Sequence, residues 1–420
     1  MTGADLIENG LDGLEALRSP RGFDASDAES GLYPALYGRD SLWVLLFLLE
    51  ALALRPDDRV EALARKSGPL VLSALAEHQG ADVNDLVEEQ PGRIPHEYHP
   101  VASAHAQDMG LPLADGRSYG GFDETFLFVL AYDAFASGLR DESTAERLWP
   151  NAARALRWID DWADDDGDGL FEYTRRHPAN LLNEVWKDSF DAVTHTGFDV
   201  PPGPLAWLEV QAYAYAVFRA ASRLFGDRHD LEAAERYRRR AEAVAARVDE
   251  QFWLGPDEGF AMALDGVKAP VRMVASNPGH ALWAGVVRPA RIDPLVARML
   301  RPDLMSAHGL RTLSCESAFY APFAYHRGAV WPFDNAIFAL GLLRHGRVAD
   351  AVRVAATVGA ALTTAGTPVE CYAVLEPERV VDPPAAGPLL CWHRWPVRNR
   401  VQAMTAGALV VFGSIQEVYG

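Results

Sequence analysis

The sequence has 420 residues, of which 49% are hydrophobic and 23% are charged, so the chain can bury a large core and no long stretch has a disordered composition. The net charge of −19 and the isoelectric point near 5.0 argue against a nucleic-acid partner and an anionic membrane surface. The most apolar run, residues 42–54, is too short to span a bilayer.

Most long segments carry a helical pattern, in which apolar residues recur at intervals of three and four positions. The pattern predicts helices over residues 41–54, 60–77, 124–137, 143–164, 204–225, 231–252, 335–343, 348–363 and 399–412. The alternation typical of strands is scarce, and no linker or shift in composition divides the chain. We therefore expect one all-α domain over residues 1–420, built as a closed array of helical hairpins.

The N-terminal segment MTGADLIENG lacks the basic and apolar regions of a secretory signal. The three cysteines, Cys315, Cys371 and Cys391, show no paired spacing, which is typical of a reducing compartment. We therefore expect a cytoplasmic protein.

The loops between the predicted helices are rich in aromatic, basic and acidic residues, and loops on a rigid scaffold often carry function. In YGRDS, Arg39 and Asp40 precede a helix. They could cap that helix and pair locally, or they could hold sugar hydroxyls through their planar, bidentate groups. The residues alone leave both interpretations open.

The loop WKDSFD places Asp188 after a Trp and a Lys, with Asp191 close enough in sequence to perturb its pKa. A carboxylic acid in such a loop is a candidate general acid. The alternative is structural, because Asp188 or Ser189 could cap a helix that begins near Phe190.

Two further segments contain candidate site residues. Glu209 and Gln211 lie within a predicted helix, where a Glu near the start is usually a surface residue favoured by the helix dipole. The loop YHRGAVWPFDN, residues 325–335, gathers Tyr, His, Arg, Trp and Asp between helix-breaking residues, and this composition favours function.

The segment DDDGDG, residues 164–169, imitates the start of a calcium-binding loop, but Arg175 occupies the position of the bidentate Glu. We interpret it as a turn that ends a helix. His96, Glu97 and His99 lack matching ligands elsewhere, so the sequence predicts no zinc site. We assign no metal ligands, and the residues alone leave open whether residues 164–169 bind calcium.

Taken in order, these segments resemble the amylo-α-1,6-glucosidase family, the catalytic part of glycogen-debranching-type enzymes. The resemblance runs over about residues 31–346, and it is carried by YGRDS, GRIPHE, YGGFDET, DGDGLFEY, NEVWKDSFDA, LEVQAYAY, ALDG, SNPGHALWAG, LRTLS and YHRGAVWPFDN.

The resemblance implies an (α/α)6 barrel whose loops surround one terminal sugar, and an inverting hydrolase that needs no cofactor. It implies that Asp188 is the general acid and that Arg39 and Asp40 hold hydroxyls of a terminal α-linked glucose. The other positions expected to bind substrate are Tyr37, His96, Glu97, Asp123, Trp186, Lys187, Glu209, Gln211, Tyr325, His326, Arg327, Trp331 and, near the C-terminus, Trp392.

The family's general base is a Glu that follows the Tyr-His loop and one helical hairpin. The corresponding region reads AGTPVECYAVLEPERV, which places Glu370 at the expected position and leaves Glu376 as the rival.

The chain also departs from the family. It has only about thirty residues before YGRDS, and near the end it carries LLCWHRWPVRNR where the family has a Pro-Gln-Ala-Trp segment. An aromatic and basic cluster there favours a small or negatively charged aglycone. From the resemblance as a whole, the main expectation is an exo-acting, inverting α-glucosidase on short glucosides or α-1,6 branches.

The alternative is a hydrolase of a compatible solute such as glucosylglycerate, mannosylglycerate or trehalose. A sugar epimerase that uses two of His96, His280, His326 and His393, or a sugar-binding protein without activity, is less favoured. The expected partner is a small glycoside, and composition does not indicate an oligomeric state.

Overall fold

The computed structural model describes residues 1–27, 33–100, 112–195, 199–375, 389–391 and 401–420. Within them the helices are α1 Gly3–Ala16, α2 Gly38–Leu54, α3 Asp58–Glu77, α5 Glu124–Leu139, α6 Glu142–Trp162, α7 Leu208–Asp227, α8 Leu231–Arg247, the π-helical turn η1 Val248–Phe252, α9 Pro278–Ala284, α10 Pro289–Met299, α11 Pro332–Arg344, α12 Val348–Ala365 and α13 Ala403–Tyr419.

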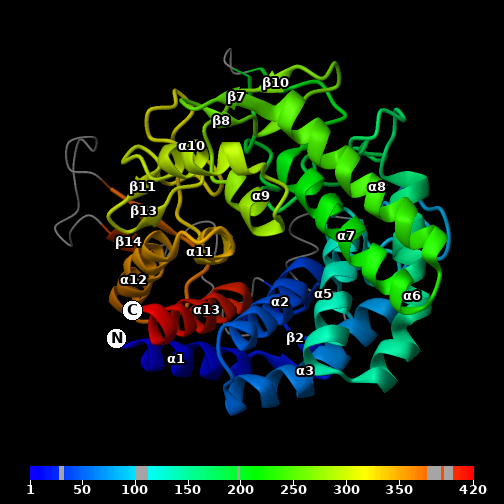
Figure 1. Cartoon of the computed structure of the whole chain (residues 1–420), viewed down its shortest axis with the longest axis horizontal. Coiled ribbons are helices and arrows are strands. Elements are labelled where there is room, and N and C mark those ends of the chain that lie inside the picture. The colour runs from blue at the N-terminus through cyan, green and yellow to red at the C-terminus, as the bar shows by residue number, and fades with distance from the viewer. Residues whose placement is uncertain (28–32, 101–111, 196–198, 376–388, 392–400) are drawn as a thin grey trace.

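The helices form a ring of two layers (Figure 1). The inner layer closes on itself, because α2 packs on α5, α5 on α7, α7 on α9, α9 on α11, α11 on α13 and α13 on α2. In the outer layer, α1 packs on α13, α3 on α2, α6 on α5, α8 on α7 and α12 on α11. This is the predicted (α/α)6 barrel.

The two layers differ in sequence for a physical reason. Inner helices have neighbours on every side, and α2 accordingly reads GRDSLWVLLFLLEALAL, with nearly all of its side chains buried. Outer helices have one solvent-exposed face, and α8 reads LEAAERYRRRAEAVAAR with only four buried residues. Among the described helices, α12 is apolar enough to cross a bilayer by composition, but it packs in the ring against α11 and α13.

Three described helices were not predicted: α1, α9 and α10. In α1, glycines obscure the helical pattern, yet they allow close packing on α13; a Cβ at Gly10 would lie 2.6 Å from the carbonyl oxygen of Ala406. Helix α9 is only seven residues long, and α10 contains Pro294. The predicted helices at 204–225 and 399–412 instead begin at Leu208 and Ala403.

The connections at the two ends of the ring differ in length. Five inner helices, α2, α5, α7, α9 and α11, lead to their outer partners through short turns: residues 55–57, 140–141, 228–230, 285–288 and 345–347. Each outer helix returns to the next inner helix through a long segment: residues 17–37, 78–123, 163–207, 253–277, 300–331 and 366–402. The described parts of these long segments therefore lie at the end where the inner helices begin.

The described strands are two or three residues long and lie within these long segments. They are β1 Arg18–Ser19, β2 Gly22–Phe23, β3 Leu36–Tyr37, β4 Glu97–Tyr98, β5 Arg117–Ser118, β6 Ala206–Trp207, β7 Trp253–Gly255, β8 Gly259–Phe260, β9 Ala263–Leu264, β10 Pro270–Val271, β11 Met305–Ser306, β12 Gly309–Leu310, β13 Tyr372–Val374 and β14 Leu389–Cys391. The orders β3-β4-β5 and β10-β9-β6 give two antiparallel three-stranded sheets, and the remaining strands pair as hairpins. These pairings brace the loops above the ring.

Candidate active site

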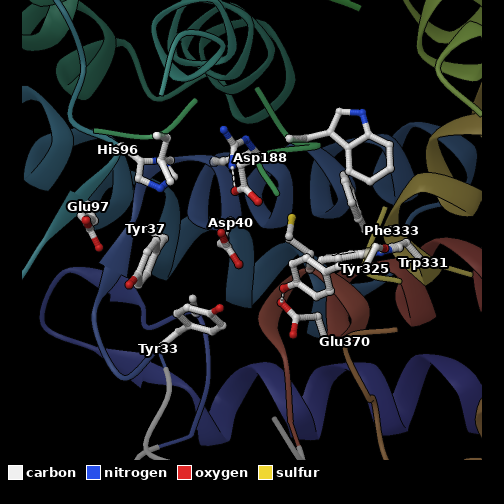
Figure 2. Close-up of a pocket in the computed structure, with 15 residues that line it drawn as sticks. Tyr33, Tyr37, Asp40, His96, Glu97, Asp188, Tyr325, Trp331, Phe333 and Glu370 are labelled. Atoms are coloured by element: carbon white, nitrogen blue, oxygen red, sulfur yellow. Dashed lines mark hydrogen bonds and ion pairs between the residues drawn. The ribbon is translucent and has the colours of Figure 1, made fainter. Parts of the chain in front are cut away.

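A cavity of about 730 Å³, including its open mouth, lies where the inner helices begin. Figure 2 shows the side chains around it. The lining residues are Ala25, Tyr33, Tyr37, Arg39, Asp40, His96, Glu97, Leu181, Trp186, Asp188, Tyr325, Trp331, Phe333, Glu370 and Met404. Aromatic rings with a few convergent charged groups are typical of a small-molecule site.

Asp188 projects into this cavity from the long segment between α6 and α7 (Figure 2). Its Oδ2 lies 3.5 Å from Nη1 of Arg39. Burial raises the pKa of Asp188, although the charges of Arg39 and His96 oppose the shift. A carboxyl group with a raised pKa retains its proton to higher pH, as a general acid requires.

Arg39, in the first turn of α2, joins the carboxylates around the cavity. Its Nε donates to Asp123 Oδ2 at 2.9 Å and its Nη2 to Asp123 Oδ1 at 2.8 Å. Nη2 also lies 3.1 Å from Glu124 Oε1. Two of the three guanidinium nitrogens are thus bound to buried carboxylates, and Nη1 faces Asp188.

His96 lies beside this group and supplies a second positive charge to the cavity wall. Its Nδ1 is 2.8 Å from Glu124 Oε1. Burial lowers the pKa of His96, but the Glu124 carboxylate more than compensates and brings it to about 9. His96 is therefore an imidazolium at neutral pH.

Asp40 follows Arg39 and also faces the cavity. Its Oδ1 accepts a hydrogen bond from Nε2 of Gln402, the N-cap of α13, at 2.7 Å. Burial raises the pKa of Asp40 to about 6, against the charge of Arg39. The carboxylate is ionised at neutral pH and can accept hydrogen bonds from sugar hydroxyls.

Asp40→Asn is expected to raise the free energy of unfolding at pH 7.5 by at most about 3 kcal/mol while it lowers activity. The pKa of Asp40 is about 6 in the folded protein, above its ordinary value of 3.8, so folding favours the protonated group. Wild type therefore has its full stability below pH 4 and loses part of it as the pH rises through 6 and Asp40 ionises. Urea unfolding at pH 4 and pH 7.5 checks this. The idea is wrong if wild type is the more stable protein at both pH values.

Glu370 reaches the cavity from the segment that leads into β13. Its Oε1 accepts a hydrogen bond from the Tyr325 hydroxyl at 2.6 Å, and its side chain is buried. Strand β13 is held by its pairing with β14 and by a bridge from Tyr372 to Val330. Figure 2 shows the Glu370 and Asp188 carboxyl groups on different sides of the cavity, with Asp40 between them.

The structure brings most predicted site residues to the cavity. Six of those described do not line it, and four of these six lie behind the wall. Asp123 binds Arg39, and Gln211 exchanges hydrogen bonds with the backbone of Phe171. Lys187 and Glu209 are fully buried and bind Asn277. These four residues do not line the cavity, so their positions do not agree with the predicted direct contact with the sugar.

His326 and Arg327 bind the loop of Asp188. His326 Nδ1 lies 2.9 Å from Ser189 Oγ, and Arg327 Nη2 lies 2.7 Å from Asp191 Oδ2. Asp191 is therefore paired with Arg327, and the charges that act most on the pKa of Asp188 are those of Arg39, His96 and Glu124 rather than that of Asp191, which the sequence had suggested. No helix begins at Phe190 within the described residues 181–195, which also argues against the N-cap role.

The sequence missed some cavity residues, and two predicted residues lie outside the described part of the chain. Tyr33, Phe333 and Met404 line the cavity. Phe333 lies in the loop 325–335 that the sequence singled out, whereas a lone aromatic or apolar residue such as Tyr33 or Met404 gives no sequence signal. The rival base Glu376 and the predicted substrate residue Trp392 lie outside the described residues.

The DDDGDG segment forms the predicted turn after α6. Asp164 accepts hydrogen bonds from the backbone nitrogens of Gly167 and Gly169, whose φ values of 75° and 79° suit glycine. Asp164, Asp166, Asp168 and Glu172 lie close enough together to hold a cation. The ammonium of Lys268 lies among them, 3.0 Å from Asp166, 3.2 Å from Asp168 and 2.8 Å from Glu172.

Lys268→Met is expected to lower the free energy of unfolding at pH 7 by about 1–3 kcal/mol, because the acidic side chains lose their shared cation. Calcium chloride should then raise the Tm of the variant and leave that of wild type unchanged. Thermal melts with calcium and with EDTA measure this. An equal response of both proteins would show that the lysine does not replace a metal.

The chain was also compared with known proteins. A family model described as the mannosylglycerate hydrolase MGH1-like glycoside hydrolase domain matches residues 81–373. The solved structure of the GH63 mannosylglycerate hydrolase from Thermus thermophilus in complex with glucose is 18% identical, with a TM-score of 0.65. The structure of the same enzyme in complex with Tris and D-glycerate is 16% identical to this chain, with a TM-score of 0.63. Both alignments cover 97% of this chain and 99% of the other. No curated protein matches the sequence significantly.

Proposed function

Because the chain belongs to the mannosylglycerate hydrolase MGH1-like family of glycoside hydrolases, we propose that it cleaves a small α-hexoside of an organic acid such as glycerate. The enzyme is a six-hairpin glycoside hydrolase. The resemblance to amylo-α-1,6-glucosidases thus identified the clan, whereas the family is the MGH1-like one and not specifically that of debranching enzymes. The compatible-solute alternative therefore replaces the α-glucosidase as the leading hypothesis.

The observation that carries the mechanism is the placement of Asp188 and Glu370 on different sides of one cavity. In the proposal, Asp188 gives its proton to the glycosidic oxygen, and Glu370 removes a proton from the water that attacks the anomeric carbon. A water between base and sugar leads to inversion, so an α-glycoside yields the β-hexose. The raised pKa of Asp188 and the Tyr325 hydrogen bond to Glu370 support these two roles.

The organic acid as aglycone is supported by the family. The matching family is that of MGH1-like mannosylglycerate hydrolases, and the structural neighbours are a mannosylglycerate hydrolase, in one case with bound D-glycerate. Asp40 is the proposed acceptor for hexose hydroxyls.

A panel of α-mannosylglycerate, α-glucosylglycerate, isomaltose, maltose and trehalose tests the proposal, with proton NMR to follow the anomer that is released. We expect kcat/KM for one hexosyl glycerate to exceed that for isomaltose at least about 100-fold, a difference of roughly 2.7 kcal/mol in transition-state binding. The β-anomer should appear first. Preference for isomaltose would instead support a debranching-type α-1,6-glucosidase, and initial release of the α-anomer would exclude inversion.

A further inference from the structure

The loop that carries Asp188 contains neither helix nor strand, yet a general acid must be held accurately against its substrate. The adjacent Lys187 is fully buried and turns away from the cavity. Its Nζ donates to Asn277 Oδ1 at 2.7 Å and to the backbone carbonyl of Thr312 at 2.8 Å. Lys187 thus ties the loop to two distant segments.

The connection continues into the inner ring. Asn277 precedes α9, and its Nδ2 donates to Glu209 Oε2 at 2.9 Å. Glu209 lies in the first turn of α7, and all three side chains are fully buried. We name Lys187, Asn277 and Glu209 the lysine tether. It links the backbone next to Asp188 to two inner helices that have little freedom to move.

The residues on either side of Lys187 and Asp188 are held as well. Trp186 stacks on His280 with ring centres 5.6 Å apart and an interplanar angle of 16°. Ser189 bonds to His326. By contrast, the contact of Asp188 with Arg39 is long, at 3.5 Å, and its carboxyl group points into the cavity (Figure 2). The loop is therefore fixed around a carboxyl group that stays available to substrate.

Stability alone does not explain a lysine at this position. Burial lowers the pKa of Lys187 to about 8, although Asp334 and Glu209 oppose the shift. A buried ion pair is often no better for stability than apolar side chains of similar volume. The specific hydrogen bonds of the ammonium are what an apolar residue could not supply.

We propose that Lys187 is a positioning residue, which sets the place of Asp188 for proton transfer through the lysine tether and does not contact the sugar. This inference rests on the proposed function, in which Asp188 is the general acid. It also assigns Glu209 and Asn277 to support of the acid loop, in place of the substrate contact expected for Glu209.

The test compares two substrates that differ in their need for an acid. These are the hexosyl glycerate that wild type cleaves and the α-fluoride of the same hexose, whose leaving group departs with little protonation. For Lys187→Met we expect kcat on the glycoside to fall about 10- to 100-fold, with less than about a threefold change on the fluoride and in KM. Lys66→Met, the same change at an exposed lysine of α3, is the matched control and should behave as wild type.

Asn277→Ser provides a second variant, in case Lys187→Met does not fold. It removes the acceptor of Lys187 and should give a smaller loss of the same kind. In the double variant the losses should not add, because the two residues act as one unit. Circular dichroism melts establish that each variant is folded.

Asp188→Asn, measured with both substrates, separates the two hypotheses. If it loses the glycoside and the fluoride equally, Asp188 is not the acid and the proposed function fails. If Asp188→Asn is selective for the glycoside but Lys187→Met lowers both rates equally or neither, the tether does not position the acid and the inference is overturned.

Discussion

Asp188→Asn is expected to lower kcat on the hexosyl glycerate about 10²- to 10⁴-fold, because the amide cannot give a proton to the leaving oxygen. The change keeps the shape of the side chain and leaves KM nearly unchanged. The raised pKa of Asp188 predicts that wild-type activity falls on the alkaline side as this group loses its proton. The variant should lack that alkaline limb, which a pH profile of kcat measures.

Glu370→Gln is the companion change and should lower kcat by a similar factor on both the glycoside and the hexosyl fluoride, because each reaction needs an activated water. Glu376→Gln distinguishes the two candidate bases. If Glu376→Gln is inactive and Glu370→Gln is not, the proposed base is wrong and the Tyr325 hydrogen bond to Glu370 serves another purpose.

Arg39→Met is expected to have the largest effect on stability, lowering the free energy of unfolding at pH 8 by about 3–5 kcal/mol. The guanidinium pairs with Asp123, Glu124 and Asp188, and its removal leaves buried carboxylates without a cation. For 420 residues this corresponds to a fall in Tm of roughly 3–6 °C. Activity should fall as well, because Asp188 loses its neighbour.

The pH dependence of the stability loss in Arg39→Met serves as the control for this prediction. Burial raises the pKa of Asp123 against the charge of Arg39, whereas the charges of Arg39 and His96 overcome burial and hold the pKa of Glu124 below its ordinary value. Without Arg39 both carboxyls bind protons more readily, so the difference from wild type should be smaller at pH 5 than at pH 8. Adding Asp123→Asn to the variant should recover part of the loss. A loss that is independent of pH would instead indicate a packing defect.

The ring itself could be predicted largely from sequence, because its helices carry strong patterns. Apolar runs such as 42–54 predict inner helices, and the amphipathic α8 is equally clear. Helix α1 was missed because its glycines pack against α13, a contact that no local pattern encodes. The short α9 depends on neighbours in the ring rather than on its own propensity.

The site could be predicted as a set of residues but not as an arrangement. Loop motifs identified Arg39, Asp40, Asp188 and Glu370, all of which line the cavity. They did not distinguish these from Lys187, which lies next to Asp188 and turns the other way. A loop without regular periodicity gives no rule for the direction of a side chain, so this distinction required the folded chain.

The unequal connections at the two ends of the ring also bear on how this architecture diverges. The short turns leave almost no room for insertion, whereas the long segments can change in length and composition without altering helix packing. Natural variation in substrate range should therefore accumulate at one end, and the other should stay nearly constant in shape. The fold is shared over 97% of this chain at only 16–18% identity, which shows that the ring tolerates wide changes in sequence.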